Sequence, residues 1–116
     1  MPNDLRIDAA TFAELQANAG ADFIAELVET FAEEAPTLLA ELRASLASGS
    51  AERFRRAAHS LKSNSNTFGA QRLAEMARTL ELGGMPQGTT LLDALEAEYA
   101  ASLVALQTLA RGGAGG

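Results

Sequence analysis

The feature that most constrains the fold is a long amphipathic pattern over residues 22–48. Its apolar residues recur every three or four positions, which is the spacing of the buried stripe on an α-helix. They are Ile24, Leu27, Val28, Phe31, Ala35, Leu38, Leu42 and Leu46. The stripe keeps its phase across Pro36, so we expect one kinked helix rather than two separate ones. A helix of this length must bury its stripe against other elements.

Four further helical segments and no convincing strand are predicted from the turn and apolar patterns: residues 8–17, 50–66, 70–82 and 90–109. The loops between them are short, which is typical of antiparallel neighbours. We therefore expect an all-α protein, an antiparallel up-down four-helix bundle with an additional short N-terminal helix across one end. Residues 1–111 are expected to form this domain, and residues 112–116 a flexible Gly-rich tail.

The helix starts carry recognisable capping residues. Asp8, Asp22 and Ser50 are expected to be N-caps, since Asp and Ser side chains accept hydrogen bonds from free backbone N–H groups. Thr90 and Asp93 have the spacing of a capping box, which predicts that the last helix opens at Thr90.

Composition excludes several classes of function. The chain of 116 residues has a formal net charge of −6, which argues against nucleic-acid binding. It contains no cysteine, so disulfides and thiolate metal sites are excluded. No apolar run approaches the roughly 20 residues that span a bilayer, and the polar N-terminus is unlike a signal peptide. We expect a cytoplasmic monomer with no membrane contact.

The single histidine, His59, and the single lysine, Lys62, stand three residues apart on the predicted third helix. At about 100° per residue, Phe54, Ala58, Leu61, Ser65 and Phe68 form its core face. His59 falls roughly 140° from the centre of that face, on the outer side. We therefore predict a solvent-facing histidine.

The surroundings of His59 are basic. Residues 51–66 hold four cations, Arg53, Arg55, Arg56 and Lys62, against the one anion Glu52. Arg55, Arg56 and Lys62 lie at the spacings at which helix side chains meet His59, whereas no acidic residue does. In an acidic protein, this pattern indicates that an anionic group binds at the histidine.

The run from His59 to Ala70, HSLKSNSNTFGA, resembles the motif of histidine-containing phosphotransfer (HPt) domains of two-component phosphorelays. That motif is approximately H-x-L-K-[GS]-x-[SA]-x-x-x-G-A. The resemblance extends from Ile7-Asp8 through the stretch that ends at Leu80-Glu81, and it covers nearly the whole chain. The chain departs from many members at Ser63, where they carry Gly.

The resemblance implies a helical bundle whose exposed histidine accepts a phosphoryl group from a receiver-domain aspartate and passes it to another. The partners would be response-regulator receiver domains, with a hybrid histidine kinase as a further candidate. The chain would need no cofactor or metal of its own, because the receiver supplies Mg²⁺.

Each candidate site residue receives a role on this basis. His59 is the phosphoacceptor, through Nε2, and Lys62 and Arg55 are expected to stabilise the phosphoryl group. Ser60 and Ser63 are small residues that line the site. Arg56, Asn66 and Phe23 are docking candidates, although Phe23 is expected to pack under the first helix. Gly69 is expected to be structural, in the turn before the fourth helix.

Other functions are less well supported by the residues. A metal or general-base enzyme lacks a histidine cluster, and the dimerisation domain of a sensor kinase usually has an acidic residue after the histidine, where this chain has Ser60. Two alternatives stay open: a phosphoacceptor domain phosphorylated directly by a chemotaxis-type kinase, and a helical adaptor that does not transfer. The starting Met and the glycine tail favour a stand-alone protein, although an excised domain would look the same.

Overall fold

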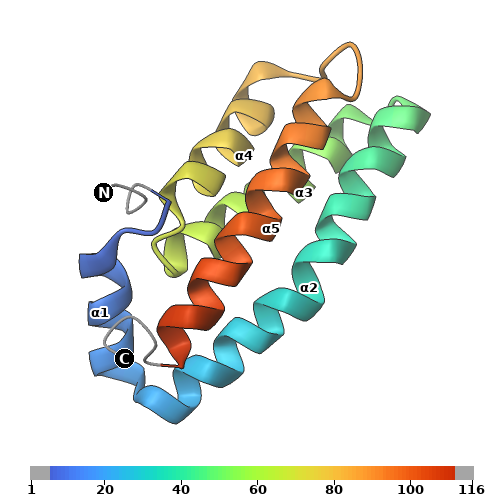
Figure 1. Ribbon diagram of the computed structural model, residues 1–116. Coiled ribbons are helices and arrows are strands. Elements are labelled where there is room, and N and C mark those ends of the chain that lie inside the picture. The colour runs from blue at the N-terminus through green and yellow to red at the C-terminus, as the bar shows by residue number, and fades with distance from the viewer. Residues whose placement is uncertain (1–5, 112–116) are drawn as a thin grey trace.

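The computed structural model describes residues 6–111, and within them the protein consists of five α-helices without a strand. The prediction of an all-α fold is confirmed for this part of the chain. Figure 1 shows the helices α1 Ala9–Ala19, α2 Ala21–Ser48, α3 Ala51–Thr67, α4 Gln71–Gly83 and α5 Thr90–Ala110. The predicted tail, 112–116, lies outside the described residues.

Helices α2 to α5 form the bundle, and α1 packs against α2 at one end (Figure 1). Helix α3 contacts α2 on one side and α4 on the other, while α5 closes the bundle against α2 and α4. This order places the outer face of α3 between two neighbouring helices. No helix within residues 6–111 combines the length and the apolar character that crossing a bilayer requires.

Helix α2 runs unbroken through Pro36, as its stripe predicts. Its start differs from the prediction, because Gly20 is at once the C-cap of α1 and the N-cap of α2. Asp22 is therefore not the cap but lies in the first turn, where a negative charge favours the helix dipole. Asp8 is the N-cap of α1, and its carboxylate accepts from the Thr11 N–H.

The other two caps agree with the prediction only in part. Ser50 is the N-cap of α3, but its side chain makes no capping hydrogen bond. Helix α5 starts at Thr90, and its N-cap is Thr89, so the predicted capping box is wrong. The backbone oxygen of Thr89 accepts from the Asp93 N–H, which already places Thr90 inside the first turn.

The core consists of the faces that the helices turn towards one another. All five residues predicted for the core face of α3 are buried: Phe54, Ala58, Leu61, Ser65 and Phe68. On α2 the buried stripe includes Leu39 and Ser45, while Leu27, Leu38 and Leu46 are only half-buried. Phe31 links three elements, since its ring lies 5.2 Å from that of Phe68 and 5.6 Å from that of Tyr99.

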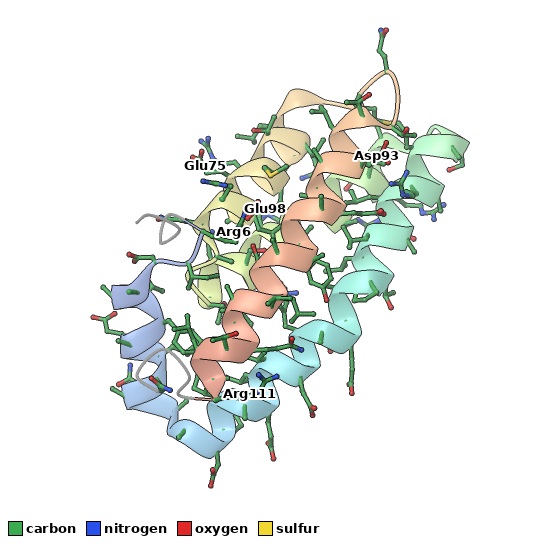
Figure 2. All side chains as sticks on the ribbon, viewed as in Figure 1. Arg6, Glu75, Asp93, Glu98 and Arg111 are labelled. Carbon is green, nitrogen blue, oxygen red and sulfur yellow. The ribbon has the colours of Figure 1, made fainter. Side chains whose placement is uncertain are left out.

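Two contacts fix the segment before α1 to the bundle. The Asp8 N–H donates to the Gly69 carbonyl at 2.6 Å, which joins this segment to the α3–α4 turn. Arg6 points towards Glu98 of α5 (Figure 2), and its Nε donates to the Glu98 carboxylate at 2.8 Å. Glu98 is almost fully buried and also accepts from Ser102, so this charge is paired and hydrogen-bonded.

Candidate functional site

His59 lies in the middle of α3, on the face opposite the core. Its side chain is 55% exposed, which confirms the prediction of a solvent-facing histidine. The neighbouring positions Ala58 and Leu61 are fully buried. Helical geometry alone therefore carries the imidazole to the surface between α2 and α4.

The closest charged partner of His59 is Glu81 from the facing helix α4. His59 Nδ1 lies 2.8 Å from Glu81 Oε2, within hydrogen-bond distance. The other carboxylate oxygen, Oε1, lies 2.9 Å from Lys62 Nζ. This second contact is an ion pair, and no hydrogen bond to Oε1 is formed by any described residue. One carboxylate thus holds both the histidine and the lysine.

The ionisation of Glu81 determines which nitrogen of the neutral imidazole carries the proton. The pKa of Glu81 lies below the usual value of a glutamate, chiefly because of Lys62 and secondly because of His59. Its carboxylate is therefore ionised near neutral pH. An ionised carboxylate only accepts hydrogen bonds. His59 must therefore donate from Nδ1–H, and Nε2 keeps its lone pair.

The arginines near His59 are largely paired with glutamates. Arg55 Nη2 lies 2.9 Å from Glu52 Oε2, and Arg56 Nε lies 3.8 Å from the same oxygen. Arg53 forms two hydrogen bonds with Glu41 of α2. The basic character predicted for this face is thus offset by carboxylates, one of them on a neighbouring helix.

A groove between α2 and α3 adjoins His59 on one side. It has a volume of about 500 Å³, and we call it the acidic groove because Glu33 and Glu34 line it. Its α3 wall consists of His59, Ser60, Ser63 and Asn64, so Ser60 and Ser63 border the same groove as the imidazole. Ser60 and Ser63 are exposed, and both carry small side chains.

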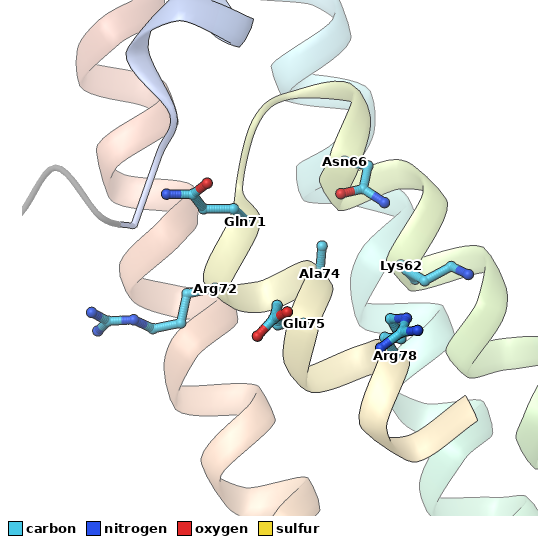
Figure 3. Close-up of a pocket in the computed structure, with 7 residues that line it drawn as sticks. All are labelled: Lys62, Asn66, Gln71, Arg72, Ala74, Glu75 and Arg78. Atoms are coloured by element: carbon cyan, nitrogen blue, oxygen red, sulfur yellow. The ribbon is translucent and has the colours of Figure 1, made fainter. Parts of the chain in front are cut away.

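A second groove, of about 570 Å³, lies between α3 and α4 (Figure 3). We call it the basic groove, since Lys62, Arg72 and Arg78 line it with only one carboxylate, Glu75. Asn66, a predicted docking residue, forms part of its α3 wall and is exposed. Arg56, another docking candidate, borders a smaller surface depression with Ser60 instead.

Phe23 and Gly69 lie apart from the imidazole. Phe23 is 51% exposed near the start of α2, so the expectation that it packs under the first helix is wrong. It lines neither groove. Gly69 has φ +77° in the turn between α3 and α4, a conformation that favours glycine.

Glu81 was missed as a site residue because helical spacing relates only residues of the same helix. The sequence signal was present in the Leu80-Glu81 pair, where a polar residue follows a core leucine at the end of an amphipathic segment. Pairing it with His59 requires the register between α3 and α4. Within residues 6–111, no group of three or more His, Cys, Asp or Glu side chains could hold a metal ion.

Comparisons with known proteins identify the family of the chain. A family model described as the Hpt domain matches residues 26–105, which include α3, α4, His59 and Glu81. Neither curated proteins nor solved structures gave a match. The match spans more than half of the chain, and Hpt domains act in histidine phosphotransfer in two-component signalling. The chain therefore belongs to the Hpt domain family.

Proposed function

We propose that this protein is a phosphorelay intermediate in which Nε2 of His59 carries a phosphoryl group between receiver-domain aspartates. The observation that carries the proposal is the exposed imidazole whose Nδ1 lies 2.8 Å from the Glu81 carboxylate. This contact leaves the solvent-facing nitrogen as the nucleophile. The domain would comprise residues 1–111, and the reversal of chain direction between successive helices in Figure 1 supports an up-down arrangement of α2–α5.

In the transfer step, the lone pair of Nε2 attacks the phosphorus of an aspartyl phosphate on the receiver. A P–N bond forms, and the P–O bond to the aspartate breaks, with the carboxylate leaving with the bonding electron pair. The ring keeps its Nδ1 proton and so gains positive charge during attack. Glu81 stabilises that charge, as a carboxylate does for the imidazolium of a catalytic triad.

Lys62 is proposed to stabilise the phosphoryl group. Its ammonium lies on the next turn of α3, and its side chain is only 24% exposed while it pairs with Glu81. The lysine stem is flexible, so the ammonium can move from the carboxylate to a phosphate on His59. Arg55 is a weaker candidate for the same role, since Glu52 already binds its guanidinium.

The proposed partners are receiver domains that supply Mg²⁺ themselves, and a hybrid histidine kinase that carries such a receiver. The imidazole borders the acidic groove on one side of α3, and Lys62, one turn further along the helix, borders the basic groove on the other. The lack of bulky side chains at Ser60 and Ser63 supports the close approach that in-line transfer requires.

The proposal is tested by incubating the protein with receiver domains from its source organism, each radiolabelled with acetyl phosphate. We expect an acid-labile, base-stable label on the wild type and none on His59→Gln. Equal labelling of His59→Gln, or no label from any receiver, would contradict the proposal. Labelling only by a kinase and ATP would instead support a directly phosphorylated acceptor domain.

A further inference from the structure

The outer face of α3 separates two grooves of opposite charge. His59, Ser60 and Ser63 form one wall of the acidic groove, while Lys62 and Asn66 form one wall of the basic groove. Since α3 lies between α2 and α4, a protein that docks over His59 reaches both grooves at once. Nε2 of His59, the nitrogen proposed to react, thus lies on the face of α3 that separates the acidic groove from the basic groove.

The acidic groove contains carboxylates that form no ion pair within the described part of the protein. Glu33 and Glu34 are exposed, and neither forms an ion pair with another residue of the described range 6–111. Leu38 of α2 lies in the same groove and adds an apolar surface beside them. The groove is therefore suited to the stem and charged end of a basic side chain.

The basic groove contains an arginine, Arg78, that forms no ion pair with a described residue and lies close in sequence to Glu81. Figure 3 shows Lys62 and Arg78 at one end of the basic groove and Arg72 at the other. Arg78 is exposed and forms no ion pair with any described residue, whereas Arg72 lies 4.0 Å from Glu98. Arg78 also precedes Glu81 by three residues on α4, which places it one turn from the carboxylate that holds His59.

We infer that these two grooves set the orientation of the docked receiver domain, which places a basic side chain against Glu33 and Glu34 and an acidic side chain against Arg78. This inference rests on the proposed function. In the reversed orientation, both contacts would join like charges, which disfavours that complex. Because phosphoryl transfer needs the aspartyl phosphate in line with Nε2, fixing the orientation raises the productive fraction of encounters.

Charges at the rim of an interface act mainly on association, and salt weakens their effect. We therefore expect the double variant Glu33→Lys/Glu34→Lys, and separately Arg78→Glu, to lower kcat/KM for transfer from receiver domains by about tenfold at low salt. The loss should lie in KM rather than kcat, and it should shrink as the salt concentration rises.

The matched controls are the double variant Glu26→Lys/Glu29→Lys and the single variant Arg111→Glu, which make the same charge changes at exposed positions outside both grooves. Figure 2 shows Arg111 at the C-terminal end of α5. The probes are receiver domains from the source organism, phosphorylated with acetyl phosphate, and thermal unfolding checks that each variant is folded.

The outcomes separate the two proposals. Slower transfer in the groove variants than in the controls supports the inference. If the wild type accepts phosphate and the groove variants are slowed no more than the controls, the inference is overturned and the proposed function stands. No transfer to the wild type from any receiver would overturn both.

Discussion

His59 Nδ1 and Glu81 Oε2 lie 2.8 Å apart, across the interface between α3 and α4. The Glu81 side chain is 10% exposed, whereas that of His59 is 55% exposed, so a largely covered carboxylate holds a ring that lies at the surface. The contact fixes which nitrogen carries the proton in the neutral ring. The chemistry of the site depends on this pair.

Glu81 is expected to keep the neutral imidazole in its Nδ1–H form. Nitrogen NMR of isotopically labelled His59 should show this tautomer in the wild type and a shift towards Nε2–H in Glu81→Ala. Transfer should slow by about 10- to 100-fold, because hydrogen bonds to charged groups are worth about 1.5–3 kcal/mol. Glu29→Ala, at an exposed glutamate of α2, is the control. An unchanged tautomer in Glu81→Ala would refute this role.

Lys62→Ala should slow transfer without abolishing it. A 4 Å ion pair is worth about 1 kcal/mol at the dielectric of water and more when a docked partner excludes solvent, so about a tenfold loss is expected. Lys62→Arg keeps the charge and should recover part of the rate. Arg55→Ala should have a smaller effect, because Glu52 already holds that guanidinium. Rates measured with a phosphorylated receiver test the ranking, and a wild-type rate for Lys62→Ala would contradict it.

Gly69→Ala should destabilise the fold more than Gly49→Ala. Both glycines have positive φ, +77° and +74°, so alanine strains the backbone at either site. A Cβ at Gly69 would also lie 3.0 Å from the Asp8 carbonyl oxygen, whereas nothing lies within 4 Å at Gly49. We expect about 1–2 kcal/mol at Gly49 and roughly 1 kcal/mol more at Gly69, measured by urea unfolding. Equal losses would show that the contact with Asp8 has no effect.

Acid should weaken the fold through carboxylates that are paired in the native state. Ion pairing lowers the pKa of Glu96, chiefly through Arg43, and the pKa of Glu41, chiefly through Arg53. Their contribution to stability is complete above the ordinary carboxyl pKa, 4.5, and is lost as the pH falls through the lowered values. Urea unfolding between neutral pH and about pH 3 should show this loss.

Arg43→Ala is the variant that isolates one of these pairs. It removes the partner of Glu96 and Asp93, so the free energy of unfolding should depend less on pH below 4.5 than in the wild type. Arg111→Ala, which removes an arginine at the end of α5, should leave the pH dependence unchanged. Identical acid profiles for Arg43→Ala and the wild type would contradict this account.

The sequence was sufficient for the features that depend on one helix at a time. The core face of α3 and the exposure of His59 follow from a period of 3.6 residues, and both were predicted correctly. Features that depend on the register between helices were not predicted. Glu81 is the clearest case, since its distance from His59 is set by the packing of α3 against α4.

The burial of some other residues was also not predicted from the sequence. Glu98 and Ser102 are buried on α5 although both are polar, because Arg6 and a mutual hydrogen bond compensate them. A hydrophobic pattern alone does not identify such positions. Phe23 is the opposite case, an apolar side chain near the start of α2 that is 51% exposed.

The central claim is that Nε2 of His59 carries the phosphoryl group. It is tested most directly by transferring phosphate from a phosphorylated receiver to isotopically labelled protein and measuring the phosphorus–nitrogen coupling by NMR. We predict a single coupling, to Nε2 of His59, with the proton still on Nδ1. Phosphate on Nδ1 of His59, or on any other residue, would contradict the account.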